Sequence, residues 1–306
     1  MDDIKLTSKN DDVLELRLKE IETLFGEVTI HRGKVHSYLG MTLVSMKGIV
    51  DNLLEKTEDY IIGTAETPAT NDLFKVNDDT MLKGKEKDLF YTLTYKLLYL
   101  SKRVRPDILV ATSYLTRRVT KSSVDDMKKL HRIIKYLRLT RDLCMTLEAN
   151  TIMEVLAFVD ASHGIHDDMR SHTGPVISIG SGTVYAKSNR QKINTKSSAE
   201  SELVGLSDSV GQIVWVRNFI MKQRYKLDRA KINHDNKTAI TLIENGKSNS
   251  ERSRHISIRY VFVHDRLKSV EIKLQYLNTE EMIADILTKP LQGSGFKYLR
   301  NRLLNI

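Results

Sequence analysis

The sequence predicts an α+β protein with α/β character in its second half, in which a mainly helical part with a small β hairpin comes first. Two observations predict this class. Up to about residue 150, apolar residues recur mostly at helical spacing, and from about residue 151 short apolar strands alternate with helices. We therefore expect domains at 1–150 and 151–295, followed by a carboxy-terminal tail at 296–306.

The first half is expected to hold helices, a hairpin and a long loop. Residues 10–25 approximate an apolar helical stripe, with Asp11 and Asp12 at the start, where the helix dipole favours acids, and with Gly26 as the stop. The remaining elements follow in order: two strands around Arg32-Gly33-Lys34, a helix over 49–61, a long polar loop over 62–85, and helices over 86–120 and 122–139.

The second half is expected to form a strand meander followed by alternating helices and strands. The strands, in order, are EVLAFVD (154–160), TGPVISIG (173–180), GTVYAKS (182–188), QKINTKSS (191–198), KINHDN (231–236) and EIKLQYL (271–277). The helices are a long one over 198–223, a short one ending near Gly246, one over 256–269 and a last one from about Glu280. Trp215 lies on the long helix and is expected in the core.

The composition favours a globular protein that stays in a reducing compartment. Hydrophobic residues make up 41% of the chain, enough to bury a core, and no apolar run approaches the roughly 20 residues of a membrane helix. The amino terminus carries early acids and no apolar segment, unlike a secretory signal. Cys144 is the single cysteine, which excludes an internal disulfide. We expect an intracellular location, in a cytoplasmic particle or the nucleus.

The charge suits a polyanionic partner. The net charge is +9 and the sequence pI is near 9.3. Lysines and arginines that neutralise phosphates release counter-ions, although the same charge also serves ordinary solubility. The basic residues of the helix at 122–139 have the same two interpretations, a solvated face or a surface that follows phosphates.

Four acids of the second half fall at ends of expected elements. Asp160 closes the first strand, Glu202 lies near the start of the long helix, Asp235 closes a later strand, and Asp285 lies in the last helix. Like charges that converge are costly unless a cation compensates them, and Mg²⁺ prefers such hard oxygen ligands. A single acid at a strand end is more often a turn former. The order of the elements, with an acid at each place, indicates a magnesium site.

Five motifs then resemble the ribonuclease H region of copia-type retrotransposon Pol polyproteins. They are FVDAS (158–162), TKSSAESELVGLSDS (195–209), HDNKTAI (234–240), SRHISIR (253–259) and ADILTKPL (284–291), and the resemblance covers essentially all of 151–295. It implies a ribonuclease H-like fold, a mixed five-stranded sheet with flanking helices. It also implies hydrolysis of the RNA strand of an RNA–DNA hybrid with two Mg²⁺ ions, for which Mn²⁺ is a possible substitute.

The resemblance also implies the site residues. Asp160, Asp235 and Asp285 match the metal-binding aspartates of the family. Glu200 and Glu202 compete for the glutamate: Glu200 completes an S-x-x-E capping box that begins at Ser197, so Glu202 is the better match and Glu200 the alternative. The expected contacts to the hybrid backbone are Lys187, Lys192, Lys196, Arg252, Arg254 and His255.

Two histidine features depart from the family or lie apart from it. Cellular ribonucleases H of this fold carry a histidine before the last helix, and the segment LNTEEM (277–282) has none. His163, His166 and His172 cluster near the first hairpin, but no cysteine accompanies them and the segment resembles an exposed loop, so an ordinary structural role is favoured over a transition-metal site.

The first half resembles the end of a reverse transcriptase. Residues 1–4 (MDDI) resemble the tail of the polymerase Y-x-D-D hairpin, and SYLGMTL (37–43) resembles the following primer grip. LLYLSKRVRPDILVATSYLTR (97–117) and the basic helix at 122–139 resemble the copia-type thumb and connection. We thus expect a carboxy-terminal Pol fragment that begins inside the palm. Asp2 and Asp3 would be vestigial polymerase residues, because the third aspartate and the fingers are missing, and no DNA synthesis is expected. The part is expected to hold the hybrid, with other parts of the polyprotein as further partners and no membrane contact.

Three alternatives compete with an active ribonuclease H. The first is a non-catalytic nucleic-acid-binding remnant, and the second is a Pol segment with a purely structural role. The third is a retroviral-type integrase, which shares the fold. The integrase glutamate follows the second aspartate, whereas here Glu202 precedes Asp235, which argues against that class.

Overall fold

The computed structural model describes residues 11–26, 37–38, 41–42, 46–78, 80–147, 154–245 and 254–306. The contacts divide the chain into two compact units, Met1–Gly48 and Ile49–Ile306. In the first unit, α1 (Asp11–Phe25) confirms the expected helix, and β1 (Ser37–Tyr38) pairs antiparallel with β2 (Met41–Thr42). The hairpin expected around Arg32-Gly33-Lys34 lies outside the described residues.

The second unit begins with a group of helices. They are α2 (Lys47–Glu55), α3 (Gly84–Arg103), the 3-10 turn η1 (Pro106–Ile108), α4 (Leu109–Arg118), the 3-10 turn η2 (Val119–Lys121) and α5 (Val124–Leu139). The helix expected over 86–120 is interrupted at Pro106, which has no backbone N–H to continue it. α5 starts with a capping box, because Ser123 and Asp126 each accept a hydrogen bond from the other's backbone N–H.

A buried polar network fixes the break between α3 and α4 against α5. Arg105 forms an ion pair with Asp107 at 2.8 Å, and the two side chains are 1% and 0% exposed. The Arg105 guanidinium also donates to both the carbonyl and the hydroxyl of Thr140. Tyr136 donates its hydroxyl to Asp107 at 2.6 Å. These bonds satisfy buried groups that would otherwise be costly.

The rest of the second unit is built on a mixed sheet. Its strands are β3 (Val155–Ser162), β4 (His172–Ile179), β5 (Gly182–Ala186), β6 (Asn189–Arg190), β7 (Ala230–His234) and β8 (Ile272–Tyr276). The order is β5-β4-β3-β7-β8, with the two-residue β6 also paired to β4. β3, β4 and β5 pair antiparallel, whereas β3–β7 and β7–β8 are parallel.

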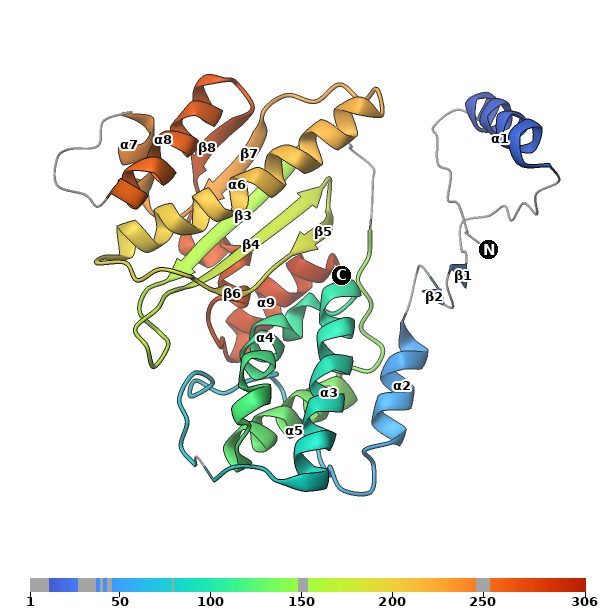
Figure 1. The fold of residues 1–306 in the computed structure, drawn as a ribbon, viewed down its shortest axis with the longest axis vertical. Helices are drawn as coiled ribbons and strands as arrows, with labels where there is room; N and C mark the ends of the chain where they lie inside the picture. The colour runs from blue at the N-terminus through green and yellow to red at the C-terminus, as the bar shows by residue number, and fades with distance from the viewer. Residues whose placement is uncertain are drawn as a thin grey trace. The chain divides into compact units, whose positions relative to one another are not determined.

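Helices cover the sheet and provide its core. The long α6 (Ser198–Lys222) crosses one face (Figure 1), with α7 (Lys237–Glu244) and α8 (Arg254–Lys268) beside it. Alternate residues of β3, namely Val155, Ala157 and Val159, share a core with the buried face of α6. The 3-10 turns η3 (Thr279–Glu281) and η4 (Ile283–Leu287) follow β8, and η4 packs against β3 and β4.

Two expectations for the second half were wrong. The fourth strand expected at 191–198 does not form: residues 191–197 run as irregular chain to the start of α6, and the two-residue β6 precedes this segment. Asp285 lies in the 3-10 turn η4 and not in an α-helix. The last helix of the chain is α9 (Gly293–Leu304), which packs through four buried residues, Phe296, Leu299, Leu303 and Leu304.

Within the second unit, the helical group packs directly on the sheet part. Ser113 of α4 donates to the carbonyl of Ser188 at 2.5 Å, and the rings of Tyr136 and Phe296 lie 5.7 Å apart at an angle of 74°. The contacts therefore do not separate the chain near residue 150, and the expected domain boundary there stays a prediction. No helix in the described ranges is both long and apolar enough to cross a membrane.

Candidate metal centre

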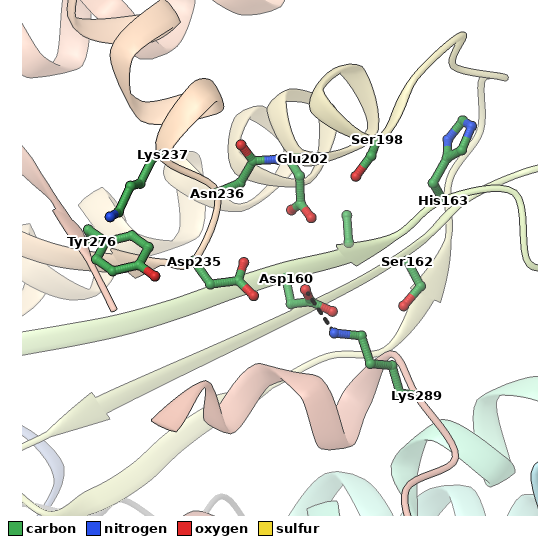
Figure 2. Close-up of a pocket in the computed structure, with 11 residues that line it drawn as sticks. Asp160, Ser162, His163, Ser198, Glu202, Asp235, Asn236, Lys237, Tyr276 and Lys289 are labelled. Carbon is green, nitrogen blue, oxygen red and sulfur yellow. Dashed lines mark ion pairs between the residues drawn. The ribbon is translucent and has the colours of Figure 1, made fainter. Parts of the chain in front are cut away.

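The topology brings the predicted acids to one edge of the sheet. Asp160 lies near the end of β3, and Asp235 follows the last residue of β7, the parallel neighbour of β3. Carboxyl ends of adjacent parallel strands meet at the same edge, which places these two carboxylates together. Glu202 comes from the second turn of α6, and Asp285 from η4. Figure 2 shows Asp160, Asp235 and Glu202 pointing into one pocket.

Three of these acids are close enough to share an ion. Asp160, Asp235 and Asp285 each offer a carboxylate oxygen, and these oxygens all lie within 4.8 Å of one another. Glu202 lines the same pocket, and its Oε2 is buried without a hydrogen-bond partner. Carboxylate oxygens are the ligands that Mg²⁺ prefers, and an orphaned buried oxygen is accounted for by a cation. The donor set therefore fits a divalent metal.

A glycine lets η4 approach the sheet. Gly174 in β4 pairs with Asp160 in the sheet register. A Cβ atom at position 174 would lie 2.7 Å from the Cβ of Leu287 and 2.8 Å from Cγ2 of Thr288, too close for any side chain. The absence of a side chain at Gly174 thus allows Asp285 to reach the carboxylates on the strands.

Burial of the cluster disfavours ionised carboxylates. Burial, and then the charge of Asp160, raises the pKa of Asp285 to about 7. Burial also raises the pKa of Asp160 above its ordinary value, against the opposing effects of the Lys289 ammonium and the Thr288 hydroxyl. The pKa of Glu202 is raised well above its ordinary value by burial and by Asp160 and Asp235. Asp160, Glu202 and Asp285 thus resist ionisation, which is typical of buried acids that hold a cation.

Neighbouring side chains orient the carboxylates. Thr288 donates its hydroxyl to Asp160, and Thr279 donates to Asp235 at 2.9 Å. The Nζ atom of Lys289 lies 2.8 Å from Asp285 and 3.6 Å from Asp160. These hydrogen bonds and ion pairs hold the three carboxylates in place at the pocket.

His234 forms a further contact behind Glu202. Its side chain is fully buried, and its Nε2 lies 3.5 Å from Oε2 of Glu202. The backbone N–H of Asn236 donates to Nδ1 of His234 at 3.1 Å. Burial lowers the pKa of His234 to about 4, so the ring is neutral, and with Nδ1 accepting, the proton is on Nε2. The N–H of His234 therefore faces Glu202.

The two candidate glutamates have different positions. Ser197 caps α6 by accepting from the N–H of Glu200, and Glu200 accepts from the N–H of Lys196 at 2.7 Å. Glu200 is thus engaged at the helix start, as its capping pattern predicts. Glu202 is buried and lines the acidic pocket.

Of the expected hybrid contacts, the three lysines do not line the acidic pocket. Lys187, Lys192 and Lys196 are exposed. Arg254 and His255 begin α8, while Arg252 lies outside the described residues, as do Asp2 and Asp3.

Two other expectations about side chains were wrong. Trp215 was expected in the core, but it is 59% exposed and stacks on Phe219 with ring centroids 5.5 Å apart. His166 and His172 were expected in an exposed loop, but both are buried, and their rings join through Nε2 and Nδ1 at 3.0 Å. Among the described residues, Asp160, Asp235 and Asp285 form the one group of three or more His, Cys, Asp or Glu side chains that could hold a metal ion.

Lys289, His234 and Thr288 are site residues that the sequence reasoning missed. Lys289 and Thr288 lie within the ADILTKPL motif, and His234 precedes Asp235 in HDNKTAI. Their place inside two motifs that carry the acids was the available signal.

The sheet order, with one antiparallel meander and two parallel additions, is that of the ribonuclease H-like fold. The homologues of the chain are retrovirus-related Pol polyproteins from copia-type transposons. No protein-family model matches the chain.

Two of these relatives show the extent of the similarity. The chain is 25% identical over 314 residues to the retrovirus-related Pol polyprotein from transposon RE1 of Arabidopsis thaliana. This match covers 99% of the chain and 21% of that protein. The chain is 24% identical over 202 residues to that from transposon TNT 1-94 of Nicotiana tabacum, covering 66% of the chain and 15% of the relative. The chain thus spans about a fifth of the length of the first of these relatives.

The solved structures to which the chain is similar include two complexes. LC11-RNase H1 in complex with an RNA/DNA hybrid is 9% identical, with a TM-score of 0.34, over 44% of this chain and 93% of that one. The foamy viral protease-reverse transcriptase in complex with an RNA/DNA hybrid is 10% identical, with a TM-score of 0.49, over 90% of this chain and 34% of that one.

Proposed function

We propose that this chain is a ribonuclease H-type endonuclease that hydrolyses the RNA strand of RNA–DNA hybrids. The observation that carries the proposal is the approach of Asp160, Asp235 and Asp285 to within 4.8 Å on a ribonuclease H-like sheet. The relatives support it, because they are retrovirus-related Pol polyproteins from transposons.

In this proposal, Asp160, Glu202, Asp235 and Asp285 hold two Mg²⁺ ions. The ions would activate water and stabilise the leaving oxygen during phosphodiester hydrolysis. The contribution of the protein is to fix the carboxylates. Thr288 and Thr279 orient two of them by hydrogen bonds, and the His234 N–H faces Glu202.

The hybrid is proposed to contact basic side chains of this part of the chain, of which Lys187, Lys192 and Lys196 are exposed. Lys187, Lys192 and Lys196, with Arg252, Arg254 and His255, are the proposed backbone contacts, because cations at phosphates supply much of the affinity for nucleic acids. The part before residue 150 is proposed to help hold the hybrid without making DNA. An intracellular site of action, in a cytoplasmic particle or the nucleus, follows from this substrate.

The test is cleavage of a hybrid with labelled RNA, in magnesium and in EDTA. Wild type is expected to cut the RNA strand in magnesium alone, and Asp235→Asn is expected to lose at least about 100-fold in rate, the scale of a lost essential charge. Glu200→Gln is the matched control, because Glu200 lies two residues from Glu202 and outside the pocket. Its rate is expected to stay within about threefold of wild type, because a lost helix cap affects stability by about 1 kcal/mol and not the site.

The alternative function is a non-catalytic nucleic-acid-binding remnant. The basic net charge of +9 favours binding by itself. Binding of the hybrid without cleavage, by a protein with a cooperative unfolding transition, would establish this alternative and remove the nuclease. A primer-extension assay on the same sample tests the expected lack of DNA synthesis.

A further inference from the structure

The ammonium group of Lys289 lies among the carboxylates of the proposed metal site. Its Nζ is 2.8 Å from Oδ1 of Asp285 and 3.6 Å from Oδ1 of Asp160. These two aspartates, with Asp235, make up the group whose oxygens lie within 4.8 Å of one another. Figure 2 shows Lys289 reaching toward Asp160 from the opposite side of the pocket to Glu202. A cation supplied by the chain thus stands where a metal ion would neutralise the same oxygens.

The three side chains differ in their freedom to move. Those of Asp160 and Asp285 are 3% and 8% exposed, whereas that of Lys289 is 37% exposed. Asp160 is further held by Thr288, and Asp285 belongs to the turn η4 that packs on the sheet. Lysine carries a point charge on a flexible stem. Lys289 can therefore leave the carboxylates for solvent while the carboxylates stay in place.

We propose that Lys289 is an internal counter-ion that competes with divalent metal for Asp160 and Asp285. In the absence of metal, it offsets the repulsion between the buried acids. When metal binds, the ammonium is displaced, because both cations need the same carboxylate oxygens. This inference rests on the metal site of the proposed function. It requires that loss of the lysine charge lowers the stability of the metal-free protein and raises its affinity for metal.

The experiment compares wild type with Lys289→Gln by calorimetric titration of Mn²⁺ and Mg²⁺ at about pH 8, above the pKa of about 7 for Asp285. Thermal unfolding in EDTA is measured on the same samples. Lys289→Gln is expected to bind the ions at least about tenfold more tightly, which corresponds to about 1.4 kcal/mol of competition removed. Its unfolding temperature in EDTA is expected to fall by several degrees. Lys289→Arg keeps the charge and is expected to bind metal no more tightly than wild type.

Lys237→Gln is the matched control. Lys237 lines the same pocket, but its Nζ lies over the ring of Tyr276, 4.4 Å from the centroid. Removal of this charge is expected to change metal affinity by less than about threefold, since no carboxylate is released. Lys289→Gln could fail to fold in EDTA. In that case, refolding during Mn²⁺ titration, with a midpoint at a lower Mn²⁺ concentration than the midpoint of Mn²⁺ binding by wild type, supports the same proposal.

The outcomes separate this inference from the proposed function. One outcome is that Lys289→Gln binds metal as tightly as wild type or more weakly, while Asp235→Asn binds none. This outcome overturns the role of Lys289 and leaves the metal site intact. Absence of any binding by wild type overturns the metal site itself.

Discussion

The imidazole of His234 faces the carboxylate of Glu202, with Nε2 and Oε2 3.5 Å apart and neither atom in a hydrogen bond. The distance is slightly beyond a well-formed hydrogen bond. Both residues come from rigid elements, β7 and α6, so a small shift of the Glu202 carboxylate completes the bond. His234 is therefore expected to position Glu202.

The first prediction tests this positioning by matched substitutions. His234→Asn keeps an acceptor near the N–H of Asn236 but removes the N–H that faces Glu202. It is expected to reduce kcat for hybrid cleavage about 10- to 100-fold, the usual effect of losing a group that orients a metal ligand. His234→Gln retains a donor near Nε2 and is expected to recover most of the rate. Steady-state cleavage kinetics measure both, and similar losses in both variants would assign His234 a packing role only.

The second prediction concerns the stability of the helical group. Asp107→Asn leaves Arg105 buried without its ionic partner and is expected to reduce the free energy of unfolding by about 3–5 kcal/mol. Urea unfolding followed by circular dichroism measures the change. Asp72→Asn is the control, because its ion pair with Lys75 is exposed and is expected to contribute less than about 1 kcal/mol. Equal effects of the two substitutions would contradict the structural role of the Arg105 network.

The third prediction uses two glycines with different surroundings. Gly174→Ala forces η4 away from β4, because the new Cβ would lie 2.7 Å from Leu287. It is expected to destabilise the protein by about 1–3 kcal/mol and to weaken metal binding, since Asp285 moves with η4.

Gly211→Ala is the control for that prediction. Gly211 lies inside α6, and an added Cβ there meets nothing within 4 Å. Alanine is expected to stabilise the protein by up to about 1 kcal/mol, as in other helix interiors. Metal binding by Gly174→Ala as tight as that of wild type would show that the placement of η4 does not govern the site.

The fourth prediction is a pH dependence of stability from the buried histidine pair. Burial, and then Arg117 and Arg190, lowers the pKa of His166 to about 4, and burial lowers that of His172 well below its ordinary value. The unfolded chain binds protons near the ordinary histidine pKa of about 6.5, so the stability from neutral histidines is complete above that pH. It is expected to fall as pH drops from about 6.5 to 4, by at most about 1.4 kcal/mol per pH unit for each ring.

The raised pKa values of Asp160, Glu202 and Asp285 have the opposite effect on stability over part of this range, because the folded protein then binds more protons than the unfolded chain as pH falls. The difference between wild type and the double variant His166→Gln, His172→Gln isolates the histidine contribution. Urea midpoints at about pH 7 and pH 5 measure it. The prediction would fail if the two proteins lost stability equally over this interval.

The sequence was sufficient for much of the fold because its patterns are local. Short apolar runs and a capping signal predicted β3, β4, β5, β7, β8 and α6 close to their observed bounds. It was not sufficient where long-range packing decides. The segment expected as the last helix forms η3 and η4 instead, since η4 is placed by its packing against β3 and β4. Trp215 followed helical apolar spacing, yet nothing in the described residues covers it fully.

The candidate site divides in the same way. The sequence by itself determined which acids stand at strand ends and helix starts, because the motifs place Asp160, Glu202, Asp235 and Asp285 at fixed positions in their elements. Only the tertiary structure decided that Glu202 rather than Glu200 enters the pocket, and that Lys289 and His234 contact the acids. These contacts join residues from α6, β7 and the segment after η4, and their geometry depends on the packing of the sheet, which no local pattern encodes.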